Sequence, residues 1–350
     1  MPLTATERVD VVNIGLMILS CCVAFLVPFE LFLFSYAVLG PLHYLTEISW
    51  LHDHQYYTKG RRDALILLGI GALMTLDHFN RMYGMELGLP EDTFISLAYV
   101  AFLGSLVLAF VKHPFYRIAG LVLVALTFGM SQHFKLFFAI FLPTLVHVYV
   151  FTGLFMLYGA LKSKSRTGLL AVGILMLCPV ALFVLFPDAN PVGVTAYGQE
   201  AYVGGKKAMG FIGMHVITLH EFFGYPDPNT EQTPGYWMHA VFGTRGSILL
   251  ARFIAFAYTY HYLNWFSKTR VIQWHKVPKA RFAVVIAIWI ISVVLYIYDY
   301  AVGLQWLFFL SFLHVLLEFP LNHTSMIGIG RVLSGRFRKQ GMAVADVPRK

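Results

Sequence analysis

Four histidines are the residues of this chain whose type and placement best suit them to hold a metal ion. His43, His147, His261 and His314 each lie inside a separate long apolar segment. An ionisable side chain in such a segment is costly, and it usually faces the interior of a helix bundle and carries function. Because the four segments are expected to bring these side chains to a similar depth, we predict that the imidazoles meet at one point and ligate one ion.

Two of these histidines are followed by a glutamate one helical turn later. The stretch HYLTE contains His43 and Glu47, and HVLLE contains His314 and Glu318. An i, i+4 spacing places both side chains on one face of a helix, where the carboxylate can ligate the same ion or orient the imidazole. Imidazole combined with carboxylate suits non-haem iron, while zinc, manganese or haem are the alternatives.

Further side chains near these pairs extend the predicted site. Three histidines are candidates for additional ligands: His52, His54 and His323. The polar and aromatic residues beside the histidines are expected to line a substrate pocket: Tyr44, Tyr260, Tyr262, Asn264 and Trp265. The sequence assigns no separate catalytic residue.

The composition indicates which elements must position these residues. Of all residues, 58% are hydrophobic and only 13% are charged, which predicts an integral membrane protein. A helical span needs roughly 20 mostly apolar residues. We therefore expect an all-α polytopic bundle of about ten transmembrane helices, at 11–27, 30–51, 63–79, 94–112, 117–132, 136–161, 168–187, 247–266, 281–302 and 304–326.

Residues 1–350 contain no Ser-, Gly- or Pro-rich linker, so a single integral membrane domain is expected. The one long connection, 188–246, is predicted to be an extracytoplasmic cap between the seventh and eighth spans. Basic residues cluster in alternate connections and in the tail 331–350, which predicts that both termini are cytoplasmic and that the membrane is a bacterial inner membrane. This topology accounts for the net charge of +8, so nucleic acid is not an expected partner.

The stretches LGPLHYLTE, AYTYHYLNWF and FLHVLLEFPLNH resemble, in their order along the chain, motifs of the Brp/Blh family (bacteriorhodopsin-related protein and its homologues). Those proteins are membrane enzymes that cleave beta-carotene to retinal with iron and dioxygen. The resemblance implies roles as ligands or as neighbours of ligands for His43 with Glu47, for His261, and for His314 with Glu318. The chain departs from the family pattern in having Glu where Asp is usual, in lacking a second histidine just after His261, and in its greater length.

Together these features predict a membrane-embedded oxidoreductase of the oxygenase or hydroxylase kind. Its substrate would be a lipophilic molecule such as an isoprenoid, a carotenoid or a lipid, and its partners would be the bilayer and an electron donor or partner subunits. The HxxxH and HxxHH clusters of membrane desaturases are absent from the sequence. Two alternatives remain open: a haem-binding electron carrier, and a transporter or structural membrane subunit without catalysis.

Overall fold

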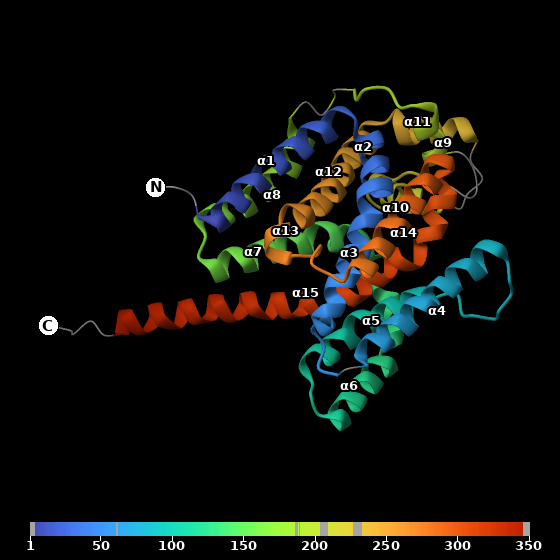
Figure 1. Cartoon of the computed structure of the whole chain (residues 1–350). Coiled ribbons are helices and arrows are strands. Elements are labelled where there is room, and N and C mark those ends of the chain that lie inside the picture. The colour runs from blue at the N-terminus through green and yellow to red at the C-terminus, as the bar shows by residue number, and fades with distance from the viewer. Residues whose placement is uncertain are drawn as a thin grey trace.

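The computed structural model describes residues 4–60, 62–185, 188, 190–203, 209–226 and 233–345, and this part of the chain is all-helical, without strands (Figure 1). The main α-helices of the bundle are α1 (Ala5–Leu26), α3 (Gly40–Asp53), α4 (Asp63–Tyr83), α5 (Thr93–Phe110), α6 (Pro114–Leu126), α7 (Thr152–Ser163), α8 (Arg166–Val184), α12 (Arg245–Ser267), α14 (Lys279–Tyr298) and α15 (Tyr300–Ala345). The remaining elements are α2 (Pro28–Phe34), η1 (Ser35–Leu39), η2 (Gln55–Tyr57), η3 (Phe128–Phe134), η4 (Phe137–Phe151), α9 (Ala196–Val203), α10 (Met209–Phe223), α11 (Pro234–Phe242) and α13 (Thr269–Ile272).

Seven helical segments of the described chain are long and apolar enough to cross a membrane, or eight if the bent pair of α11 and α12 counts as one span. These segments are consistent with an integral membrane protein, but they do not confirm the predicted count of ten. Two of the predicted spans, 63–79 and 117–132, are not among them. The first lies in α4, whose last turns carry Asp77 and Arg81, and the second lies largely in α6, which has only 13 residues.

The helix α12 forms the middle of the bundle, and 16 of its 23 residues are buried. It packs against α1, α2 and the π-helical segments η1 and η4. A second apolar cluster joins α4 and α5 to α15, so α15 borders both halves of the core. Because α12 is enclosed by other helices, its polar residues are shielded from lipid, as ionisable groups in spans require.

Local sequence signals fix where several helices begin. Thr4 caps α1 and forms a capping box with Glu7, while the hydroxyls of Ser165 and Thr244 cap α8 and α12. Pro28 and similar prolines stand in the first turn of their helices, where the missing N–H costs nothing.

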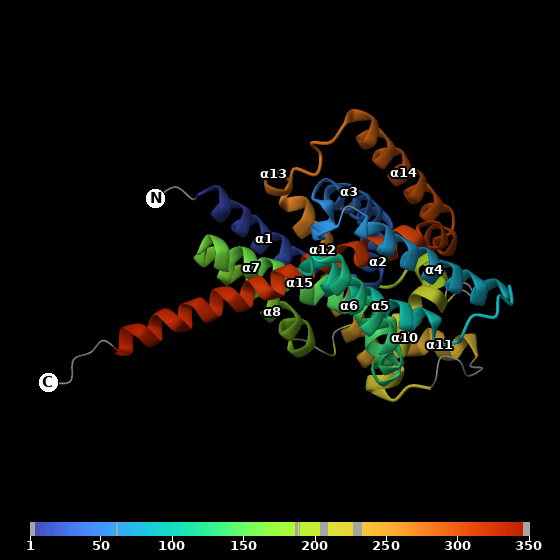
Figure 2. The ribbon, with the colours of Figure 1, turned by 90° about the horizontal axis from the view of Figure 1, so that it is seen from below.

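The segment predicted as a cap contains three short helices in its described part, α9, α10 and α11. All three pack on the bundle, through contacts of α9 with α2 and of α10 and α11 with α12. They lie together at one end of the bundle in Figure 1. At the other end of the chain, 331–345 continue α15 as one helix that runs away from the bundle in both Figures 1 and 2, while 346–350 lie outside the described residues.

Candidate metal centre

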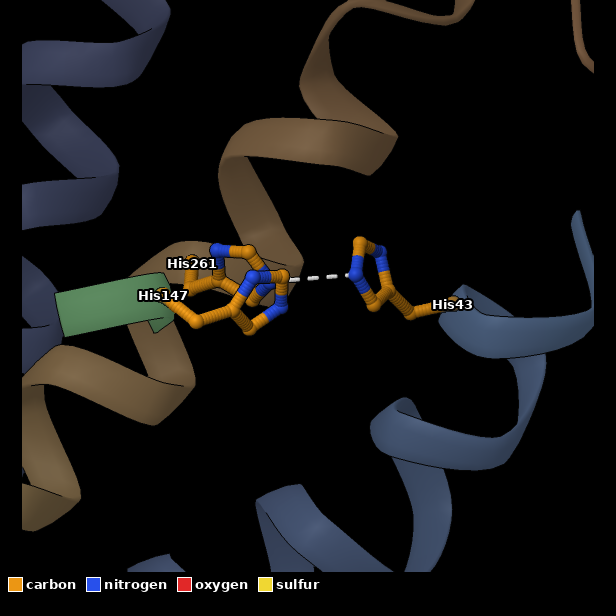
Figure 3. Close-up of side chains that lie close together, drawn as sticks. All are labelled: His43, His147 and His261. Carbon is orange, nitrogen blue, oxygen red and sulfur yellow. Dashed lines mark hydrogen bonds between the residues drawn. The ribbon is translucent and has the colours of Figure 1, made fainter. Parts of the chain in front are cut away.

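The four predicted histidines lie side by side in the interior of the bundle, although they come from four different helices. His43 is on α3, His147 on η4, His261 on α12 and His314 on α15, and none of them is more than 7% exposed. Figure 3 shows three of the rings converging from separate helices. Sequence-distant segments therefore bring four imidazoles to one buried place.

The four rings form a closed loop in which each ring has two neighbours. The centroid distances around the loop are 4.6 Å from His43 to His261, 4.9 Å on to His147, 4.9 Å on to His314 and 5.5 Å back to His43. Two nitrogen pairs are in direct contact: the Nε2 atoms of His43 and His261 are 3.0 Å apart, and those of His147 and His314 are 3.1 Å apart. Two nitrogens that bind one ion at about 2.0–2.1 Å and at right angles stand about 3 Å apart, so both contacts have the length expected of adjacent ligands.

In His261 and His147 the nitrogen that faces away from the loop, Nδ1, lies beside an oxygen atom. The hydroxyl of Thr152 donates to the carbonyl oxygen of Val148 at 2.8 Å, and it lies 2.7 Å from Nδ1 of His261. Because the single hydroxyl proton is already donated, the oxygen accepts from Nδ1–H, and Nε2 of His261 is left as a lone pair. Glu318 Oε2 lies 2.8 Å from Nδ1 of His147, within the distance of an ion pair, although the two atoms do not meet the geometry of a hydrogen bond among the described residues.

The two glutamates contact different imidazole nitrogens, one that faces the loop and one that faces away from it. Glu47 Oε2 is 3.0 Å from Nε2 of His43, the same nitrogen that faces His261. Glu318, in contrast, contacts the outer nitrogen of its imidazole, on His147 and not on its own-helix neighbour. Glu47 is therefore placed to bind an ion directly, and Glu318 is placed to orient a ligand.

A metal ion explains these contacts better than hydrogen bonds among neutral rings. A single Nε2–H on His43 cannot donate well to both Glu47 and His261, yet both are at 3.0 Å. In the protein alone, Glu47 Oε2 and Nδ1 of His314 are buried without a hydrogen-bond partner among the described residues. An ion between the rings would give Glu47 Oε2 a binding partner. The sets His43–His147–His261 and His43–Glu47–His314 each offer ligand atoms within 4.8 Å of one another.

Two supporting residues were not predicted from the sequence. Thr152 follows His147 by five residues, and the π-helical bonding of η4 brings positions about five apart to one side, which an i, i+4 spacing does not indicate. Thr46 accepts a hydrogen bond from Nε1 of Trp265 at 3.0 Å, and that indole forms a T-shaped contact with the ring of His43, with the centroids 5.5 Å apart. No residue pattern in the sequence marks the π-helix or the contact of Thr46 with Trp265, so neither threonine could be predicted.

The residues predicted to line a substrate pocket divide into two groups. Tyr44 stacks on His314 with centroids 4.3 Å apart, and its hydroxyl contacts that of Tyr262 at 2.9 Å. Tyr260 instead bonds to Asn13, at 3.3 Å, on the α1 side. Of the remaining two, Trp265 borders the ring of His43, and Asn264 is buried with its Oδ1 lacking a hydrogen-bond partner among the described residues.

The three additional histidines belong to none of the ligand groups in the described chain. His52 is exposed and contacts the carboxylate of Asp53. His54 is also exposed and its Nδ1 donates to the carbonyl of Trp50. His323 is buried, but its Nε2 lies 2.9 Å from the carbonyl oxygen of Phe102. Their proposed role as outer ligands has no support from this arrangement.

Fold and site together define a helical protein with long apolar helices and a buried group of histidines that could bind a metal ion. Comparisons of the chain with protein-family models, with curated proteins and with solved structures gave no match.

Proposed function

We propose that this chain is a membrane-embedded oxidoreductase that holds one redox-active metal ion among four imidazoles and Glu47. The observation that carries the proposal is the closed loop of four buried rings, with two Nε2 pairs at 3.0 and 3.1 Å. In this proposal His261 contributes a lone pair whose direction is set by Thr152, and the carboxylate of Glu318 lies 2.8 Å from Nδ1 of His147. Orienting contacts of this kind fix the tautomer of a metal ligand and raise its basicity.

The charge of the site also supports a divalent cation. Glu47 and Glu318 are each about 2% exposed, and their close cationic neighbours in the described chain are histidines only. A buried carboxylate needs a proton, a paired cation or a metal. One divalent ion would neutralise both carboxylates while leaving the four imidazoles uncharged.

Iron is the ion that we propose first, because mixed imidazole and carboxylate donors suit non-haem iron. Zinc would fit the same donors without redox chemistry. Haem fits less well, because axial nitrogens on opposite faces of a porphyrin are about 4 Å apart at the usual bond lengths, and the contacting pairs here are closer than that.

A substrate that dissolves in the bilayer is consistent with a site enclosed by apolar helices. Tyr44 and Tyr262 on one side and Trp265 on the other supply the aromatic surface that an isoprenoid, a carotenoid or another lipid would contact. The order of the three His-containing motifs, which resembles that of the Brp/Blh family, supports the same class of chemistry. We place both termini in the cytoplasm of a bacterial cell, with α4 and α6 completing a set of about ten crossings.

Metal analysis of the detergent-purified protein tests the proposal. We expect about one equivalent of iron after reconstitution, and its loss in His43→Ala and His147→Ala. His323→Ala is the matched control, since it removes a buried histidine outside the loop and should leave the metal content unchanged. A folded protein that takes up no transition metal would refute the proposal and leave a hydrogen-bonded histidine cluster. Zinc bound in place of iron would retain the site but remove the redox function.

A further inference from the structure

Five tyrosines from four elements lie together beside the histidine loop, and none of them is more than 8% exposed. The ring of Tyr36 is the central one, with centroids 6.0, 6.2 and 6.4 Å from those of three other members. Tyr44 also stacks on His314, with centroids 4.3 Å apart, so this group borders the candidate metal centre. The five residues form a phenol cluster: Tyr36 on η1, Tyr44 on α3, Tyr258 and Tyr262 on α12, and Tyr296 on α14.

The hydroxyl groups of the phenol cluster carry more protons than the described protein atoms accept. Tyr44 and Tyr262 share one hydrogen bond of 2.9 Å, in which one hydroxyl donates to the other and the second proton has no acceptor in the described chain. The hydroxyl of Tyr296 is buried without a hydrogen-bond partner among the described residues. In this part of the chain, two phenolic protons of the cluster therefore lack an acceptor.

The rings that carry these protons are held in place by close contacts with backbone. Tyr296 packs on Gly303, where an added Cβ would stand 2.5 Å from Cγ of the ring, and the hydroxyl of Tyr197 donates to its carbonyl oxygen. Tyr44 packs on Gly40, where an added Cβ would stand 2.8 Å from the hydroxyl oxygen. A buried tyrosine hydroxyl usually has a partner, and leaving it unpaired is costly. Packing of the rings alone therefore does not account for the cluster.

We propose that the phenol cluster binds the carbonyl oxygen of a lipophilic substrate, such as a keto-carotenoid or an isoprenoid quinone. The inference rests on the proposed function and names the substrate class of the same site. A carbonyl oxygen has two lone pairs and brings no proton that would need an acceptor. A hydroxyl-bearing lipid would add a donor where donors are already in surplus, and a hydrocarbon would leave both phenolic protons unpaired.

The position of the phenol cluster suits a group that anchors the substrate beside the histidines. Tyr44 stacks on His314 through its ring, and Tyr262 lies 5.2 Å from His43, while their hydroxyls meet each other. A carbonyl bound to this pair is thus one phenol ring away from the imidazoles. Aromatic walls with a few placed polar groups are typical of small-molecule sites. The inferred substrate differs in its oxygen from the hydrocarbon that the Brp/Blh family cleaves.

The test measures ligand binding to the full chain without metal, so it does not depend on turnover. The probes are canthaxanthin and beta-carotene, which share one skeleton and differ in the ring carbonyls, and binding is followed by quenching of tryptophan fluorescence. Tyr296→Phe and the double variant Tyr44→Phe/Tyr262→Phe should each weaken canthaxanthin binding roughly threefold to tenfold, and leave beta-carotene binding unchanged. Tyr262→Phe alone keeps one spare proton, on Tyr44, and should bind canthaxanthin nearly as well as the wild type. Tyr298→Phe is the matched control, since that ring is 81% exposed on the same helix as Tyr296.

An infrared spectrum of the wild type gives a second measurement that needs no variant. A hydrogen bond lowers the C=O stretching frequency of bound canthaxanthin, so an unshifted band overturns the inference. Decylubiquinone, titrated in the same way, decides between the two sources of the carbonyl, and binding of either probe that weakens in Tyr296→Phe supports the inference.

The outcomes also separate this inference from the proposed function. If the wild type holds iron but binds no carbonyl probe in a manner that Tyr296→Phe and the double variant weaken, the substrate class is wrong and the metal site stands. Binding of the hydroxylated carotenoid zeaxanthin as tightly as canthaxanthin would also contradict the surplus of donors. A protein that binds canthaxanthin through its tyrosines but takes up no transition metal would refute the proposed function and leave a site for carbonyl-bearing lipids.

Discussion

Replacing Thr152 by valine tests whether the histidines are metal ligands or only a hydrogen-bonded cluster. Valine has nearly the shape of threonine, so little cavity forms, but it removes the acceptor that lies 2.7 Å from Nδ1 of His261. Nδ1–H of His261 is then left buried without an acceptor. The tautomer with its proton on Nδ1, which directs the Nε2 lone pair into the loop, is no longer favoured over the other tautomer. Loss of such an orienting contact typically weakens metal binding by about 10–100-fold, which corresponds to about 1.4–2.8 kcal/mol.

The assay is a competition for iron(II) between the purified protein and a chelator of known affinity, with thermal unfolding of the metal-free protein measured in parallel. Thr152→Ser keeps the hydroxyl and should bind iron nearly as tightly as the wild type. Thr75→Val is the matched control, because the Thr75 hydroxyl bonds only to the carbonyl of Gly71 in its own helix. If Thr152→Val binds iron with unchanged affinity, or if Thr152→Ser is equally weak, the assignment of the tautomer and its role is wrong.

Three further predictions address the glutamates, the phenol pair and the cap. Glu47→Gln should weaken iron binding more than Glu318→Gln, since only Glu47 faces a loop nitrogen, and equal losses in the chelator competition would contradict this difference. Gly40→Ala should destabilise the protein by about 1–3 kcal/mol, because a new Cβ would stand 2.8 Å from the Tyr44 hydroxyl; Gly69→Ala, whose Cβ meets open space, is the control in thermal unfolding. Burial lowers the pKa of His215 in α10 from 6.5 to about 3, so the folded state favours the neutral ring and stability is lost as the pH falls below about 6.5, by up to about 1.4 kcal/mol per pH unit. His215→Asn should flatten this dependence of the unfolding free energy on pH, which is measured between about pH 7 and pH 5.

The apolar runs predicted most of the membrane helices because a span must bury its backbone hydrogen bonds within itself, and this constraint is visible in composition. The runs 94–112 and 281–302, for example, correspond to α5 and α14. The predicted spans in α4 and α6 are not confirmed, because the last turns of α4 carry charged residues and α6 is short. Composition cannot state whether such a helix crosses the membrane or packs beside helices that do.

The histidines could be selected from the sequence because an imidazole deep in an apolar segment is costly and therefore conspicuous. Which carboxylate contacts which histidine could not be predicted from the sequence. The spacing of His314 and Glu318 suggested that the two act together, but the carboxylate contacts His147 on another helix. A helical spacing places two side chains on one face, and only the packing of neighbouring helices decides which of them meet. The hydroxyl of Thr152 was missed for the same reason, because it contacts His261 on another helix.

The different placement of the two carboxylates bears on how the centre would respond to a change in oxidation state. With both ionised, a ferrous ion gives a site of zero net charge, and a ferric ion leaves one positive charge. An unbalanced charge is expensive in a low-dielectric interior, so the proposed site would stabilise the ferrous form relative to a site with a third carboxylate. A reductant in water cannot reach rings that are at most 7% exposed. If the site holds a redox-active ion, as proposed, its electrons would therefore have to pass through the side chains that surround the four rings.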